Sequence, residues 1–113
     1  MKNENPLLGT WTADLIRWSV DADNMAPIIW LTLSRLRVEF QEDQMSIQNY
    51  GVRPTTNADY RFLSTDGNCL RIKAISYRRK STAVFEIDFL NENQLTMTMI
   101  SPKQDRMYLK RSS

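Results

Sequence analysis

Histidine is absent from this sequence of 113 residues, and Cys69 is its only cysteine. Without histidine the chain lacks the commonest general base and metal ligand, the serine–histidine–acid triad, and haem ligation through histidine. A single cysteine excludes an intrachain disulfide and a cluster of thiolate ligands. The three glycines, at positions 9, 51 and 67, stand too far apart for a loop that cradles phosphate. We therefore predict neither a metal nor a cofactor.

Acidic side chains are what remains for acid–base chemistry or calcium binding. They fall on strand faces predicted to meet solvent or in predicted turns: Glu39, Glu86 and Asp88 in the first group, and Glu42, Asp43 and Glu92 in the second. We expect solvated surface groups at these positions and predict no catalytic residue. An enzyme that uses carboxylates or tyrosine is the third of three hypotheses about function.

Long apolar runs are also absent. No stretch approaches the roughly 20 apolar residues of a membrane span, and residues 1–9 hold no apolar signal-peptide segment. We expect a cytoplasmic protein, although a secreted or periplasmic domain that has lost its leader would have the same sequence. Fifteen basic and thirteen acidic residues give a net charge of only +2, which does not favour nucleic acid as a partner.

The composition is that of one globular domain. Hydrophobic residues make up 42% and charged residues 25%, which separates the chain from disordered sequences. A chain of this length buries one core and is too short for two. No segment is repeated or low in complexity, so we predict a single domain over residues 1–113.

Apolar and polar residues alternate in segment after segment, which is the period of half-buried strands. The inward positions of this pattern are Leu36, Val38 and Phe40, then Met45 and Ile47, Tyr60 and Phe62, Leu70 and Ile72, Phe85, Ile87 and Phe89, Leu95, Met97 and Met99, and Met107 and Leu109. Polar turns separate the segments. Two of them are residues 65–68, whose Asp-Gly pair provides the positive φ of a hairpin turn, and the basic Arg78-Arg79-Lys80.

The N-terminal third is less regular. We predict a first strand from about Gly9 to Ser19, long enough to bend partway. We predict a short helix or an irregular cover at residues 25–33, because Pro27 lies near the start of this segment and an apolar run follows it. This segment could be a lid at the mouth of the fold, a plug beneath it, or a surface for a protein partner.

Two further departures from the pattern lie in the middle of the chain. Residues 52–58 contain Pro54 and predict a loop. Ile75 and Tyr77 are one residue out of step with the apolar positions before them, so we predict a bulge near Ala74 that restores the phase.

About eight strands joined mostly by short turns predict an up-and-down antiparallel order. An open sheet of this kind would leave two unpaired edges, whereas pairing the first strand with the last removes both. Eight strands also suffice to close a barrel whose interior is filled by side chains or holds one small ligand. We therefore predict an all-β, eight-stranded antiparallel barrel.

The two ends of the chain resemble a known family. Leu8-Gly9-Thr10-Trp11 is similar to the Gly-x-Trp opening of lipocalins and their smaller lipocalin-like relatives, and residues 107–111 resemble the closing strand of that group with its terminal basic residue. In that family the tryptophan lies across the barrel floor and a basic side chain covers it. The resemblance implies these roles for Trp11 and for Arg111 or Lys110, in a cation–π contact worth about 0.5–2 kcal/mol. The helix that lipocalins carry before their last strand has no counterpart between Met99 and Asp105.

The leading hypothesis is a lipocalin-like binding protein that takes a small hydrophobic or amphipathic molecule into the barrel. The residues we predict to line that site are Trp18, Trp30, Tyr60, Tyr77 and Met97. Six methionines and eleven aromatic residues could form a soft, adaptable lining, or could equally fill the barrel as core. The second hypothesis is a filled barrel that acts through protein contacts, as an inhibitor, immunity-type or scaffold protein. Its working surface would be the exposed strand faces and the hairpin at residues 78–80.

Overall fold

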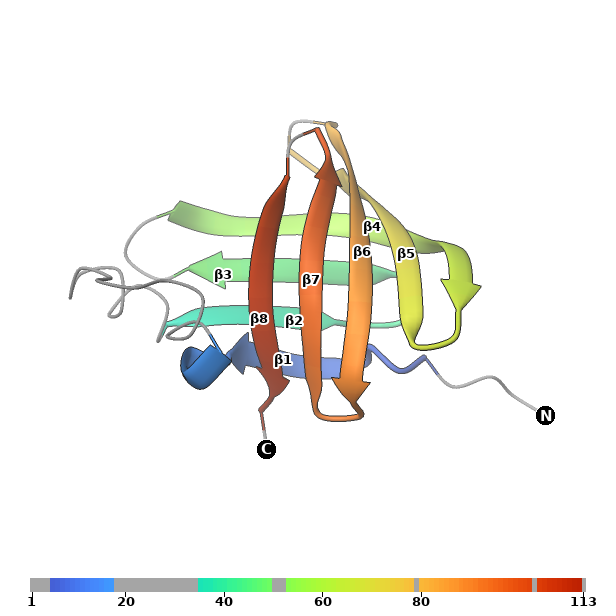
Figure 1. The fold of residues 1–113 in the computed structure, drawn as a ribbon. Helices are drawn as coiled ribbons and strands as arrows, with labels where there is room; N and C mark the ends of the chain where they lie inside the picture. The colour runs from blue at the N-terminus through green and yellow to red at the C-terminus, as the bar shows by residue number, and fades with distance from the viewer. Residues whose placement is uncertain (1–4, 18–34, 50–52, 79, 103, 113) are drawn as a thin grey trace.

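The computed structural model describes residues 5–17, 35–49, 53–78, 80–102 and 104–112 (Figure 1). These residues form eight strands: β1 (Gly9–Ala13), β2 (Leu36–Phe40), β3 (Gln44–Asn49), β4 (Arg53–Asp66), β5 (Cys69–Ser76), β6 (Thr82–Asn91), β7 (Gln94–Ser101) and β8 (Asp105–Arg111). Each strand pairs antiparallel with the next, and β1 also pairs with β8, which closes the barrel. The predicted eight-stranded up-and-down barrel is confirmed. The cover predicted at residues 25–33 lies outside the described residues.

The barrel is flattened into two layers that cross. In Figure 1, β1, β2 and β3 run across the direction of β6, β7 and β8. The long strand β4 belongs to both layers, because its residues 53–59 pair with β3 and its residues 58–66 pair with β5. A register shift between Phe62 and Ser64 marks a bulge within β4, and a bulge of this kind bends its strand.

The core lies between the two layers and consists of inward residues of all eight strands together with Leu7, which precedes β1. Its buried apolar members are Leu7, Trp11, Ala13, Leu36, Val38, Phe40, Met45, Ala58, Tyr60, Leu70, Ile72, Ala74, Phe85, Ile87, Leu95, Met97 and Leu109. Alternation along β5 illustrates the origin of this core, since Leu70, Ile72 and Ala74 are buried while Arg71 and Ile75 are exposed. The period-2 pattern therefore places the apolar face inward, as a half-buried strand requires.

The first strand is shorter than predicted, because β1 ends at Ala13 and residues 15–17 form a helical turn. The carboxylate of Asp14 accepts a hydrogen bond from the backbone N–H of Arg17. This is the bond that an aspartate makes when it caps the start of a helix. The cap offers the backbone a favourable alternative to the strand, so the chain leaves the sheet at Asp14.

The predicted loop at residues 52–58 is wrong, because β4 begins at Arg53. Proline has no N–H to donate to a strand ladder, and it is tolerated in a sheet near the start of a strand or at a bulge. Pro54 has both advantages. The partners change from Ile47↔Thr56 to Asn49↔Arg53, so the register shifts at this point.

The predicted bulge near Ala74 is also wrong. The β4–β5 register runs without a shift from Ala58↔Ser76 to Phe62↔Ile72 and places Ala74 opposite Tyr60. Ala74 itself is the inward residue that keeps the phase. Ile75 is therefore an exposed apolar residue on the outer wall rather than the sign of a shift in phase.

The predicted turns at residues 65–68 and 78–80 are confirmed. Asp66 and Cys69 are paired, which leaves Gly67 and Asn68 as a two-residue loop, and Gly67 has a φ of +61°. A two-residue hairpin needs such a positive φ, which glycine adopts without strain. In the second turn, Lys80 N–H donates to Ser76 O at 3.0 Å.

Candidate functional site

Trp11 closes one end of the barrel. Its side chain is fully buried, and its indole Nε1–H donates to Leu7 O at 2.9 Å. The Phe89 ring meets it edge-on at 6.3 Å between centroids. The guanidinium carbon of Arg111 lies 4.3 Å from the centroid of the indole, within the range of a cation–π contact. The structure therefore places Arg111 over the tryptophan, whereas Lys110 is exposed.

The donors of Arg111 are directed to backbone carbonyls around this floor. Nη1 donates to Leu8 O at 2.7 Å, Nη2 donates to Pro6 O at 3.1 Å, and Nε and Nη2 both donate to Glu92 O, at 3.2 and 3.1 Å. Gly9 has a φ of +120°, and a Cβ at this position would lie 3.0 Å from Nη1. The glycine of the Gly-x-Trp sequence thus leaves space for the arginine.

At the opposite end of the barrel the inward side chains are less deeply buried. We call Ile47, Ala83, Met99 and Met107 the rim residues; they pack on the core but remain partly exposed. They lie near the end of β3, the start of β6, the end of β7 and the start of β8. In an up-and-down barrel these strand ends meet at the end that carries the β1–β2 connection. The rim residues therefore surround the end of the barrel remote from Trp11.

Alanines lie on the inner wall beside the rim residues. Ala74 stands opposite Tyr60 on one neighbouring strand and opposite Ala83 on the other, and Ala58 stands opposite Ser76. A methyl group occupies much less volume than the Trp, Phe, Leu and Ile side chains that fill the other end. These inward positions of β4, β5 and β6 therefore carry small side chains, although Leu36 at the start of β2 is large and buried.

Two of the five residues predicted to contact a ligand lie deep in the core. Met97 is fully buried, and Tyr60 is 5% exposed. The Tyr60 hydroxyl donates to Gln41 O and accepts a hydrogen bond from Asn5 Nδ2 at 2.7 Å. Burial raises the pKa of Tyr60, which keeps the phenol neutral. Both side chains belong to the packed part of the barrel, below the rim residues.

The other predicted contacts do not join them. Tyr77 is 44% exposed on the outer wall, where its hydroxyl donates to Asp59 Oδ1 at 2.6 Å, so it does not line the interior. Its placement continues the regular phase of β5, in which Ile75 is exposed. Trp18 and Trp30 lie outside the described residues.

The inward alanines are the candidate site residues that sequence reasoning missed. Ala58, Ala74 and Ala83 occupy inward positions on β4, β5 and β6. Each lies in the half of its strand that is nearer the end of the barrel with the β1–β2 connection. Their signal in the sequence was small size at an inward position, a feature that becomes informative only once the strand register is known.

A second polar cluster attaches the helical turn at residues 15–17 to the outside of β7 and β8. Asp14 is 4% exposed, and its Oδ2 accepts from Arg17 Nε at 3.0 Å and from Gln94 Nε2 at 2.9 Å. Arg17 Nη2 donates to Leu109 O at 3.1 Å and also to Leu95 O. These bonds hold the chain where it enters the β1–β2 connection.

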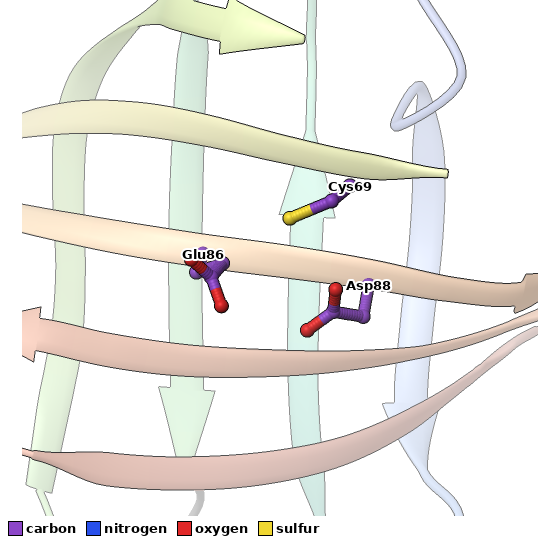
Figure 2. A group of neighbouring side chains, drawn as sticks. All are labelled: Cys69, Glu86 and Asp88. Carbon is purple, nitrogen blue, oxygen red and sulfur yellow. The ribbon is translucent and has the colours of Figure 1, made fainter. Parts of the chain in front are cut away.

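Of the described residues, Cys69, Glu86 and Asp88 form the group that could hold a metal ion (Figure 2). Cys69 and Asp88 are register partners on the outer wall, and the candidate ligand atoms of all three lie within 4.8 Å of one another. Thiolate and carboxylate groups ligate zinc in other proteins. Here Glu86 is engaged by Arg71 at 3.1 Å, and the cluster alone does not establish a metal site.

We expect Cys69 to react slowly with iodoacetamide. The pKa of the thiol is raised from 9.0 to about 11. Partial burial is the largest cause, and the hydrogen bond to Asp88 and the charges of Asp88 and Glu86 add to it. The thiolate is the reactive form. With the pKa raised to about 11, both the fraction of thiolate and the alkylation rate at pH 8 should be about 100-fold lower than for an ordinary thiol. Asp88→Asn should accelerate alkylation, whereas Asp59→Asn, on another part of the wall, should not. A rate equal to that of a free cysteine derivative would contradict this expectation.

A broad surface depression of about 1120 Å³ lies at the Trp11 end. Its lining mixes the apolar Phe62 and Leu90 with the acidic Glu42 and Glu92. Arg111 also borders it, but the donors of this side chain are bonded to carbonyls of the floor. The arginine that borders the depression is thus already engaged by the floor of the barrel.

Comparison with protein-family models, curated proteins and solved structures finds no match to this chain. Within the described residues, no helix has both the length and the apolar character needed to cross a membrane. The case for a function therefore depends on the geometry of the barrel.

Proposed function

We propose that this protein is a lipocalin-like binding protein that takes a small apolar molecule at the rim end of its barrel. The observation that carries the proposal is the contrast between the two ends of the inner wall. Trp11 is fully buried beside the partly exposed Phe89, whereas at the other end Ile47, Ala83, Met99 and Met107 are all partly exposed. Apolar linings with few polar groups are typical of small-molecule sites.

The individual side chains suit this role. Met99 and Met107 are unbranched and flexible, so they can adapt to ligands of different shape. The neighbouring inward residues Ala58 and Ala74 have small side chains. The covering of Trp11 by Arg111 supports the lipocalin-like assignment, because the resemblance implies this contact between the tryptophan of Gly-x-Trp and a basic residue of the closing strand.

Binding should raise the thermal midpoint of unfolding. A test panel of decanol, decanoate, retinol and a porphyrin covers neutral, anionic and bulky apolar ligands. A ligand at 100 times its Kd stabilises the native state by about 2.7 kcal/mol, which corresponds to a rise in Tm of about 10 °C for a domain of this size. Differential scanning fluorimetry with intrinsic tryptophan emission provides the measurement.

The variant Ala83→Phe tests the same space without knowledge of the ligand. If the rim end is open to a ligand, the phenyl ring should fit with a change in the free energy of unfolding below about 1 kcal/mol and should abolish the rise in Tm. In a filled interior, the same change would overpack the core and cost about 1–3 kcal/mol. Val84→Phe, on the outer face of the same strand, is the matched control. Overpacking together with no response to the panel would refute the proposal and favour a filled barrel that acts through protein contacts.

A further inference from the structure

The depression at the Trp11 end is bordered by turns that lie far apart in the sequence. Glu42 belongs to the β2–β3 turn, Gly67 to the β4–β5 turn and Glu92 to the β6–β7 turn, and all three line its volume of about 1120 Å³. In an up-and-down barrel every second connection lies at the same end, which explains why these turns meet. Leu70, a buried residue of the core, also lines the depression. The depression is therefore continuous with the inner wall of the barrel.

Large apolar side chains in this lining remain in contact with water. Phe62 is 42% exposed and Leu90 is 54% exposed. The Phe62 ring meets the ring of the buried Tyr60 edge-on at 5.9 Å between centroids, so an aromatic contact links the depression to the core. Exposed apolar side chains grouped in a concave surface beside a few polar groups are typical of a binding site.

The charged residues that line the depression are Glu42, Glu92 and Arg111. Within the part of the chain that the structure describes, neither carboxylate has a salt-bridge partner. The guanidinium of Arg111 covers Trp11 and donates to backbone carbonyls of the floor. Two unpaired carboxylates and one engaged cation therefore leave an excess of negative charge in the lining.

Other cations near this end of the barrel lie on its outer wall. Each is the exposed neighbour of a buried residue on its strand, and none of them lines the depression: Arg61 follows Tyr60, Arg71 follows Leu70, and Lys110 follows Leu109. The alternation along a strand turns such neighbours to opposite faces of the sheet. These side chains therefore do not neutralise the glutamates inside the depression.

We infer that this depression binds an amphipathic cation, a small molecule whose protonated amine pairs with Glu42 and Glu92 while its apolar part covers Phe62 and Leu90. The site is separate from the rim end, and the inference does not depend on the function proposed there. An ammonium group gains attraction from both carboxylates, whereas an anionic head would meet charge of its own sign. A neutral head would gain no ion pair.

Decylamine, decanol and decanoate share one apolar chain and differ in their head group, so they test this preference. At pH 7 the amine is protonated, and decylamine should bind about 5-fold or more tightly than decanol, since one exposed ion pair contributes a factor of up to about 5. Decanoate should bind less tightly than decanol. The advantage of decylamine should shrink as the salt concentration rises from about 20 to about 500 mM, because salt screens exposed charges.

Isothermal titration calorimetry measures these affinities, and NMR shifts of the Gly67 and Asn91 backbone amides report binding in the depression. Equal affinities for the three ligands, no binding of decylamine, or binding without shifts at these amides would each overturn the inference.

The combined variant Glu42→Gln and Glu92→Gln should abolish the preference for decylamine and should fold normally, because both side chains are exposed. The combined variant Glu86→Gln and Asp88→Asn removes the same charge from the outer wall of β6 and should leave the preference unchanged. A preference that survives the loss of both glutamates of the depression would place the amine elsewhere and refute the inference.

Ala83→Phe distinguishes this site from the rim end. It should leave the affinity for decylamine and the amide shifts unchanged, whether or not the rim end binds a ligand. If Ala83→Phe removes the binding of decylamine, the amine occupies the rim end, and the inference is wrong while the proposed function stands.

Discussion

Trp11→Ala should lower the free energy of unfolding by about 3–5 kcal/mol, the usual cost of truncating a large buried aromatic side chain. The indole has no solvent exposure, and truncation would remove its hydrogen bond to Leu7 O and its edge contact with Phe89. It would also leave Arg111 above a cavity. Urea unfolding followed by circular dichroism measures the loss, since the variant removes one of the three tryptophans.

A double-mutant cycle separates the cation–π contact from the packing of the ring. Trp11→Phe and Arg111→Met, made singly and together, should show a coupling free energy of about 0.5–2 kcal/mol. Lys110→Met is the matched control, because its side chain is exposed beside the same strand end. Zero coupling, or an equal effect of Lys110→Met, would show that Arg111 acts only through its bonds to the floor carbonyls.

The barrel itself could be predicted because its strands obey local rules. From Leu36 to Leu109 most inward apolar residues recur at period 2, and a one-residue slip would expose the whole face. Phe62 was predicted inward but is 42% exposed, beside the bulge of β4. The turn at Gly67 could be predicted from the sequence, because its positive φ is one that few residues other than glycine adopt without strain. Closure followed from the need to pair both edges of such a sheet.

The errors have a common physical origin, because each depends on a contact that the local pattern does not contain. Pro54 enters β4 because a register shift against β3 removes the need for its N–H. The end of β1 is set by Asp14, whose capping bond competes with the strand. The placement of Tyr77 required the phase of β5 over several residues, whereas its apolar spacing alone suggested a bulge.

The candidate site was less predictable than the fold. Aromatic residues were predicted as ligand contacts, yet Tyr60 is part of the packed core. The rim end is defined by residues such as Ala74 and Ala83, and alanine at an inward position has no distinct signature in the sequence. Its meaning depends on which strand ends meet at the same end of the barrel, and that is a property of the closed topology.

Asp14 combines deep burial with a charge, which makes its partners important for stability. Burial alone would raise its pKa, but hydrogen bonds from Gln94 and Arg17, together with the charge of Arg17, lower the pKa below 3.8. The folded state therefore favours the ionised carboxylate. Its contribution to stability is fully present above the unfolded pKa of about 4 and is lost as the pH falls through the folded value.

Arg17→Met should lower the free energy of unfolding by about 2–4 kcal/mol at pH 7, because removing one partner of a largely buried pair leaves the other charge uncompensated. The side chains of Arg17 and Asp14 are 18% and 5% exposed. The difference from the wild type should shrink below pH 4, where Asp14 is protonated in the variant and the charge left unpaired disappears. Arg71→Met breaks the exposed pair with Glu86 and should cost less than about 1 kcal/mol. Equal losses for the two variants in urea unfolding would show that the helical turn contributes little to holding β7 and β8. A larger loss for Arg17→Met that does not change with pH would show that Arg17 acts through its bonds to Leu95 O and Leu109 O rather than through Asp14.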